Sequence, residues 1–215
     1  MYIPPHFAAE DLEQVAAFVD HAGAASIVTF DGSRPVASLI PVIWDRSGEG
    51  HGRLLGHVAL ANQQWRTAQP GVPALAIVHG PQAYISPSWY QSTAEHGRTV
   101  PTWNYIAVHF TGPVTFHQDA GWLREVVTRL TDKHEDGRAQ RWRVQDAPPA
   151  YLDGQLRGIV GLELTVTQVE AKEKLSQNRG PRDRAGVVEA LRQLPDSGSR
   201  EIAGLMAARE SAGLR

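Results

Sequence analysis

Runs of β-branched, aromatic and aliphatic residues recur at short intervals along the first 170 residues. They do not alternate with long helical segments, as the strands of a parallel sheet built from βαβ units would. We therefore predict about six strands in a mainly β fold with peripheral helices (α+β), arranged as an antiparallel barrel. Periodicity alone does not separate a barrel from a sandwich. The predicted strands cover residues 26–30, 36–44, 53–58, 74–79, 103–116 and 159–169, with a further one over 82–86 after the Gly80-Pro81 break.

Helical periodicity lies between and after these runs, and it is clearest where apolar residues recur every three or four positions. The polar residues 87–101 are predicted to form a long loop. The last predicted helix begins after Pro195-Asp196-Ser197-Gly198, with Ser199 as its N-cap. The predicted helices cover residues 9–22, 60–68, 120–135, 146–154, 182–194 and 199–210.

The composition is that of a folded globular protein, with 42% hydrophobic and 20% charged residues. Cysteine is absent, which excludes a disulfide framework, a cysteine zinc site and a cysteine nucleophile. The nine histidines are scattered and never four positions apart, so no metal site is predicted. The chain begins with no basic and apolar leader and has no membrane-spanning apolar stretch, so a cytoplasmic location without membrane contact is expected.

The charge is unevenly distributed along the chain. The 215 residues carry 21 Lys and Arg against 23 Asp and Glu, a net charge of −2. Residues 171–215 contain nine basic and six acidic residues, a net charge of +3, which leaves −5 for residues 1–170. We therefore predict a barrel domain over residues 1–170 and a basic segment with a helical appendage over 171–215. The near-neutral total gives no general reason to bind nucleic acid.

The segment from His57 to Arg66 is the first candidate site, because a predicted strand ends there and a predicted helix begins near Asn62. Free N–H groups at the start of a helix bind phosphate, and the side chains of His57, Asn62 and Arg66 would add donors. A capped helix on the rim of the barrel explains the same residues equally well.

Two further segments contain residue types that could bind a ligand. Residues 84–105 are rich in Trp and Tyr, which suits a planar heteroaromatic ligand, although an aromatic core or interface explains the pattern more often. His96, Arg98 and Tyr90 are the only acid or base candidates in this loop, and we assign no catalytic residue. Residues 172–179 are dense in cations and hydrogen-bond donors, and by composition alone they read as a solvated linker.

Taken together, these segments resemble the PaiB family of FMN-binding negative transcriptional regulators. Five blocks occur in the order of that family, across residues 1 to about 190. The blocks are MYIPPHF at 1–7, GHVA, AN and QW within 56–65, GPQAYISPSWY at 80–90, VPTWNY at 100–105 and KLSQNR at 174–179.

The resemblance implies a split β-barrel of the pyridoxamine-phosphate-oxidase type and a homodimer with FMN at the subunit interface. It places the flavin ring along Ser38, Leu39, Ile40 and Pro41. It places the phosphate at the segment after the third strand, and Lys174 and Gln177 on the flavin from the partner subunit. The cofactor residues that it implies around the phosphate are His57, Val58, Ala59, Asn62 and Trp65. The chain departs from the family at residues 38–41, where a His or Asn often precedes the proline run, and at Leu60, where an Arg is common.

The leading functional hypothesis is a flavin-dependent regulator or sensor of the PaiB type. The alternative is an FMN-dependent oxidoreductase that acts on a small molecule. A haem-binding split barrel is less favoured, because an axial histidine is expected in the C-terminal segment and no histidine follows His134. The lack of a recognisable helix-turn-helix and the overall acidity argue against direct DNA binding. The sequence assigns no role to residues 195–215.

Overall fold

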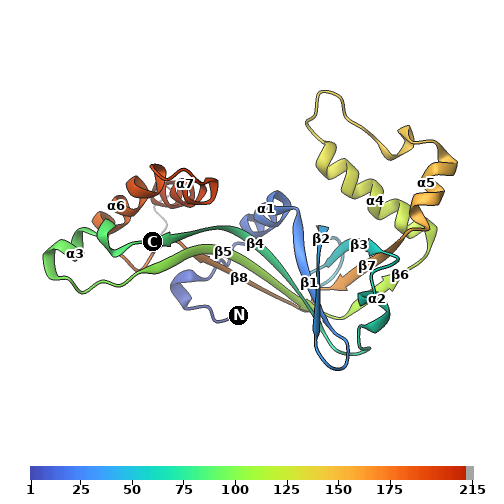
Figure 1. Cartoon of the computed structure of the whole chain (residues 1–215), viewed down its shortest axis with the longest axis horizontal. Helices are drawn as coiled ribbons and strands as arrows, with labels where there is room; N and C mark the ends of the chain where they lie inside the picture. Colours follow the sequence, from blue (N-terminus) through green and yellow to red (C-terminus); the bar gives the residue numbers. More distant parts are fainter. Residues whose placement is uncertain (212–215) are drawn as a thin grey trace. The chain divides into compact units, whose positions relative to one another are not determined.

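The structure is a computed structural model that describes residues 1–211 (Figure 1). The chain forms two compact units, each built from several segments. Unit 1 comprises Met1–Val15, His79–Val108 and the chain from Ala171 on, and unit 2 comprises Ala16–Val78 and His109–Glu170. The predicted division into residues 1–170 and 171–215 remains a prediction.

Eight strands form a sheet in the order β6-β7-β3-β2-β1-β4-β5-β8. Strand β1 pairs antiparallel with β2 and β4, and β3 with β2 and β7, while β6 pairs antiparallel with β7. The predicted fold class, an antiparallel split β-barrel with peripheral helices, is confirmed. The strands are β1 (Ala24–Phe30), β2 (Pro35–Asp45), β3 (Arg53–Ala59), β4 (Ala74–Ile85), β5 (Thr102–Gly112), β6 (Val114–His117), β7 (Ile159–Thr165) and β8 (Gln168–Lys174).

The helices lie outside the sheet and include three short 3-10 turns. Within residues 1–211, no helix is both long and apolar enough to cross a membrane, and the cytoplasmic location stays a prediction. The helices are η1 (Pro5–Phe7), α1 (Leu12–Ala22), α2 (Gln64–Thr67), η2 (Pro87–Trp89), α3 (Gln91–His96), α4 (Ala120–Glu135), η3 (Val144–Asp146), α5 (Pro149–Leu156), α6 (Pro181–Arg192) and α7 (Ser197–Ser211).

In unit 2, α4 packs on strands β3 and β7, as Figure 1 shows. Its apolar stripe places Val126 and Leu130 against Leu55 of β3. Trp122, one turn earlier, covers Gly161 of β7 so closely that a β-carbon at Gly161 would lie 2.0 Å from the indole ring. The same indole stacks on His117 of β6, with ring centroids 4.2 Å apart. The glycine is therefore required for α4 to pack on this part of the sheet.

In unit 1, α6 and α7 pack on each other and on one face of the sheet. The residues that fill this core come from β4, from the residue between η2 and α3, from the turn after β8 and from both helices. They include Ala83, Ile85, Tyr90, Leu175, Val187, Leu191, Ile202 and Met206. Helices α6 and α7 are thus folded onto the sheet, and the sequence predicted both of them as amphipathic helices.

Three strand boundaries and one helix cap differ from the prediction. Strand β4 runs through Gly80-Pro81 without a break, because proline keeps an extended backbone and disrupts only the ladder bond that it cannot donate. The predicted strand over 103–116 is divided at Pro113 into β5 and β6. The predicted strand over 159–169 is two strands, so the expected linker at 172–174 belongs to β8. Asp196, not Ser199, caps α7, since its carboxylate accepts from the Ser199 N–H at 2.7 Å.

We expect Gly161→Ala to destabilise the protein by about 2–4 kcal/mol, because Trp122 has to move away from the sheet. Gly204→Ala in α7 is the matched control, since a β-carbon there meets nothing within 4 Å and alanine favours the helix. Urea unfolding measures both changes. A Gly161→Ala variant as stable as the wild type would contradict the packing described for Trp122.

Candidate functional site

In unit 2, the site predicted from sequence lies where β2 and β3 run side by side. Val42 pairs with Gly56, so Pro41 and His57 are the next residues on the two strands. Because side chains alternate along a strand, His57 shares a face with Leu55, and Leu39 and Pro41 share the corresponding face of β2. Leu39 is 73% exposed and Pro41 is exposed as well. The structure therefore brings an exposed apolar surface beside His57.

His57 itself is half-buried, and its Nδ1 atom is buried without a hydrogen-bond partner among the described residues. Burial lowers the pKa of the His57 imidazole, since a charged ring loses its hydration there. An unpaired buried nitrogen costs free energy until a ligand or water pairs with it.

The turn after β3 is held by side-chain amides. Asn62 donates from its amide to the Ser38 hydroxyl at 2.8 Å, and its carbonyl oxygen accepts from the Gln64 N–H at 2.9 Å. Gln64 is fully buried, and its amide nitrogen lies 2.9 to 3.1 Å from acceptors on β1 and β2. Ser38 and Asn62, which were predicted as cofactor residues, are thus in direct contact, and Gln64 anchors the turn that carries Asn62.

Helix α2 begins at Gln64 and has four residues, so it is shorter than the predicted helix over 60–68. Several backbone N–H groups of this turn are already used inside the protein, including those of Leu60, Asn62 and Gln64. Fewer backbone donors therefore remain for a phosphate than the sequence suggested. The indole N–H of Trp65 donates to the Leu60 carbonyl at 3.1 Å.

Strand alternation divides the remaining predicted cofactor residues of unit 2 into buried and exposed ones. Ile40 and Val58 are core side chains, 5% and 4% exposed, so a cofactor would meet only their backbone. Ala59, at the end of β3, is exposed. The predicted ring strand thus offers Leu39 and Pro41 on its surface, with the Ser38 hydroxyl held by Asn62.

In unit 1, Lys172, Lys174 and Arg179 form what we call the cation cluster. Within residues 1–211, none of the three has a carboxylate oxygen within 4.0 Å. Their charges lie on aromatic rings instead. The Lys172 ammonium is 5.2 Å from the centroid of Tyr105, and the Arg179 guanidinium is 4.6 Å from that of Tyr90. A cation over a ring keeps its full charge, so the cluster remains able to attract an anion.

Lys174 lies at the centre of the cluster and is held by β5. Its ammonium donates to the Thr102 hydroxyl and, at 2.7 Å, to the Trp103 carbonyl. Burial lowers the pKa of the Lys174 ammonium, and the positive charges of Lys172 and Arg179 lower it further. An anion bound at the cluster would offset this repulsion, because an opposite charge favours the protonated ammonium.

The turn after β8 is fixed by buried polar contacts that the sequence interpretation missed. Asn104 of β5 is fully buried and donates to the Ser176 hydroxyl at 3.0 Å. Ser176 has a φ of 63°, a left-handed conformation that non-glycine residues seldom adopt. Gln177, a predicted cofactor residue, uses its amide locally: it accepts from the Leu175 N–H at 2.7 Å and donates to the Glu173 carbonyl at 2.6 Å.

The loop over 86–101 is partly helical, with η2 and α3. His96 and Arg98 are exposed, and the His96 Nδ1 accepts from the Arg98 N–H at 3.0 Å. Tyr90 is buried, and its hydroxyl makes no hydrogen bond to the described residues. Burial raises the pKa of the Tyr90 phenol, which keeps it protonated. Of the three candidates in this loop, only Tyr90 lies beside the cation cluster, through Arg179.

Comparison with known proteins finds both sequence and fold similarity. Residues 1–168 match a family described as "Putative FMN-binding domain". The chain is 34% identical over 206 residues to "Protease synthase and sporulation protein PAI 2" of Bacillus subtilis (strain 168), covering 96% of each chain.

Two solved structures share the fold at low sequence identity. The flavocytochrome Anf3 from Azotobacter vinelandii superposes with a TM-score of 0.59 at 15% identity, over 93% of this chain and 78% of its own. The FAD and heme binding protein from Mycobacterium smegmatis gives a TM-score of 0.55 at 18% identity, over 77% and 72%. At these identities the similarity concerns the fold alone.

We expect His57 to make stability depend on pH. As pH falls through about 6.5, the unfolded chain binds a proton that the buried ring, with its lowered pKa, does not yet bind. The free energy of unfolding therefore decreases until the pH reaches the folded-state pKa. A His57→Gln variant of the flavin-free protein should lose less stability between pH 7.5 and 5.5 than the wild type, as measured by urea unfolding.

His79→Gln provides the control, since His79 is an exposed histidine on β4. It should leave the pH dependence unchanged. An unaltered pH dependence in His57→Gln would mean that His57 is hydrated and free to titrate in the folded protein.

Proposed function

Because the chain belongs to the FMN-binding domain family that its residues 1–168 match, we propose that it is a homodimeric, flavin-dependent regulator or sensor. Membership in this family confirms the resemblance to PaiB and the assignment of FMN as the cofactor. The dimer, the position of the flavin and the regulatory role are the proposal.

The cation cluster is the observation that carries this proposal. FMN has a phosphate of about −2 charge, and its binding site needs positive charge that no protein carboxylate already neutralises. Lys172 and Lys174 provide two such charges, and Arg179 adds a third that also interacts with the carboxylate of Asp183. Burial, and then the repulsion among the three cations, lowers the pKa of Lys174. Structural ion pairs elsewhere in unit 1, such as Arg209 with Glu173 at 3.1 Å, do not leave charge free in this way.

Unit 2 supplies complementary groups for the rest of the cofactor. Leu39 and Pro41 offer an exposed apolar face for a flat ring, and the half-buried imidazole of His57 lies beside it. Following the family pattern, we propose that the partner subunit's Lys174 and Gln177 complete each site. Gln177 would act mainly by shaping the turn, because its own amide is bonded to the backbone.

Bound FMN supplies redox chemistry, namely the transfer of electrons as hydride or singly. The residues described here bind and orient it. The protonated Lys174 ammonium would pair with the anion, and the His57 ring, kept neutral by its lowered pKa, would lie beside the flavin. A partner copy covering Leu39 would also exclude water from the apolar ring.

The regulatory role is proposed from the resemblance to the PaiB family and from the B. subtilis relative, whose name includes "sporulation protein". The alignment covers 96% of this chain and 96% of that relative. The overall charge of −2 favours regulation without direct DNA contact. The alternative, an FMN-dependent oxidoreductase acting on a small molecule, follows from the chemistry of flavin itself. Haem binding is disfavoured by the absence of any histidine after His134.

Mixed dimers test whether the site is shared between subunits. His57→Ala and Lys174→Met should each weaken FMN binding, Lys174→Met by tenfold or more, because a charge-assisted contact of about 1.5–3 kcal/mol is lost. A heterodimer with one change in each copy, purified through two tags, should recover one wild-type site, since one site receives both changes and the other neither. Fluorescence titration with FMN measures this.

Arg192→Met is the control, because Arg192 is exposed on α6 and is not among the residues of the proposed site. A heterodimer in which no site recovers would place His57 and Lys174 in the same copy's site. A monomer in solution, or single variants with unchanged affinity, would overturn the proposed site while leaving FMN binding by the family intact.

Turnover separates the regulator from the enzyme. We expect the FMN-loaded protein to oxidise NADH or NADPH no faster than free FMN does, as followed by absorbance at the nicotinamide band. In cells that lack the gene, the wild-type chain should restore the transcript profile, and the Lys174→Met variant should not. Saturable oxidation well above the rate with free FMN would favour the oxidoreductase instead.

A further inference from the structure

Two aromatic rings stand exposed on the sheet of unit 1. Tyr84 of β4 is 48% exposed and Trp103 of β5 is 45% exposed, and these two strands are neighbours in the sheet. The ring centroids lie 6.2 Å apart, with the ring planes inclined by 61°. The Gln82 side-chain oxygen accepts from the Trp103 indole N–H at 3.0 Å, which holds the indole in place. We call this pair of rings the aromatic platform, because it offers flat, ordered contact area for another ring.

The aromatic platform lies on the face of the sheet opposite α6 and α7. Ala83, which precedes Tyr84, is buried in the core that these two helices fill, and Asn104, which follows Trp103, is fully buried. Strand alternation therefore turns the platform to the other face. Figure 1 shows α6 and α7 on one side of β4 and β5 and the N-terminal segment on the other. That segment covers Lys172, whose ammonium donates to one of its carbonyls at 3.0 Å, and leaves the platform exposed.

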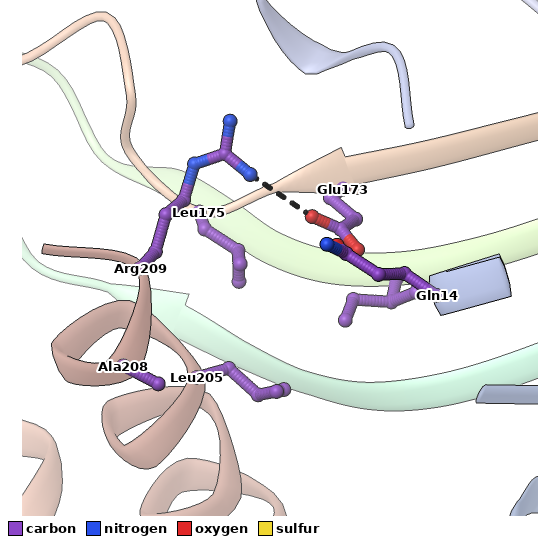
Figure 2. Close-up of a pocket in the computed structure, with 7 residues that line it drawn as sticks. Gln14, Glu173, Leu175, Leu205, Ala208 and Arg209 are labelled. Atoms are coloured by element: carbon purple, nitrogen blue, oxygen red, sulfur yellow. Dashed lines mark hydrogen bonds and ion pairs between the residues drawn. The ribbon is translucent and has the colours of Figure 1, made fainter. Parts of the chain in front are cut away.

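Lys174 connects the aromatic platform to the cation cluster. Its ammonium donates to the Trp103 carbonyl at 2.7 Å and to the Thr102 hydroxyl, so one of its three N–H groups is left for a ligand. Neither β4 nor β5 contains an acidic residue. Strand alternation places Glu173 on the opposite face, where Figure 2 shows it paired with Arg209. The side of the sheet that carries the platform therefore favours a ligand that is flat and negatively charged.

We propose that the aromatic platform binds the adenine ring of an adenylate group whose phosphate lies at the cation cluster. The inference rests on the proposed function, because it takes the cluster as the phosphate site of the flavin. Either a free adenine nucleotide or the adenylate half of FAD carries this group. In the second case the protein accepts FAD as well as FMN, with the extra base stacked on Trp103 and Tyr84.

A nucleotide fits this arrangement because one ribose joins its flat base to its phosphate. The residue that presents the indole is also the residue whose carbonyl holds Lys174, so the ring contact and the charge lie side by side. Bases stack on Trp and Tyr through their π faces, which requires no further recognition. The Gln82 amide nitrogen has no partner among the described residues and can donate to a nitrogen at the edge of the base.

Calorimetric titration of the flavin-free full chain with FMN and with FAD tests the proposal. We expect the wild type to bind FAD at least about fivefold more tightly than FMN, because stacking of the base adds to the same phosphate contact. Trp103→Leu and Tyr84→Leu should each reduce this preference and leave the affinity for FMN unchanged. Leucine at 103 keeps the main-chain carbonyl that holds Lys174.

A competition experiment distinguishes the two sources of the adenylate group. AMP should displace FMN from the wild type more effectively than ribose 5-phosphate, which has the phosphate without the base, and the two should be equal in Trp103→Leu. Discrimination by AMP without a preference for FAD would assign the aromatic platform to a free adenine nucleotide. Trp142→Leu is the matched control, because Trp142 is 47% exposed in unit 2, and it should behave as the wild type does.

The proposal is overturned if the wild type discriminates neither FAD from FMN nor AMP from ribose 5-phosphate, or if both preferences persist in Trp103→Leu and Tyr84→Leu. Lys174→Met separates this failure from that of the proposed function. Weaker FMN binding in Lys174→Met, together with unchanged preferences in the platform variants, would retain the flavin phosphate site and reject the base site. Unchanged FMN and FAD affinities in Lys174→Met would reject the phosphate position itself, and with it the arrangement inferred for adenylate.

Discussion

The buried contact between Asn104 and Ser176 is the interaction on which unit 1 depends. It holds a left-handed residue in place directly after β8 and so fixes how the chain turns toward α6. Both side chains are removed from water, and the Asn104 amide also lies 3.5 Å from the sulfur of Met206 in α7. A polar pair at this depth is costly to break, because each group would be left buried and unpaired. The same contact therefore sets the positions of Lys174, Arg179 and helix α7.

Charge is handled differently on the two faces of this part of the sheet. Lysines 172 and 174 lie among aromatic rings, whose faces attract cations without neutralising them. Glu173, between them in sequence, meets Arg209 and forms a neutral pair. The first arrangement leaves positive charge for an anion, whereas the second leaves only hydrogen-bonding capacity. The same short segment of β8 therefore offers two chemically distinct surfaces.

The sequence predicted the elements with strong periodicity and missed the contacts made through tertiary packing. Helix α4 was predicted with its observed bounds, because its apolar stripe is regular. The end of β8, residues 172–174, was interpreted as a linker, because an alternation of Lys and Glu becomes recognisable as a strand only through the rings of Tyr2, Phe7 and Tyr105. The contact of Ser38 with Asn62 joins residues that the sequence had assigned to one cofactor. No sequence pattern marks the unpaired nitrogens of His57 and Arg209, because their lack of a partner results from how the folded chain buries them.

Strand β8 has a consequence for how this protein can change over evolution. Its side chains alternate between the two faces, so losing or gaining one residue between Thr167 and Lys174 would exchange every side chain from one face to the other. Glu173 would then stand among the rings, and the lysines would face α7. A substitution in this strand alters one of the two surfaces at a single position, whereas a change in its length alters both surfaces at once. Insertions and deletions in relatives that keep both surfaces should therefore fall in the turns on either side of it.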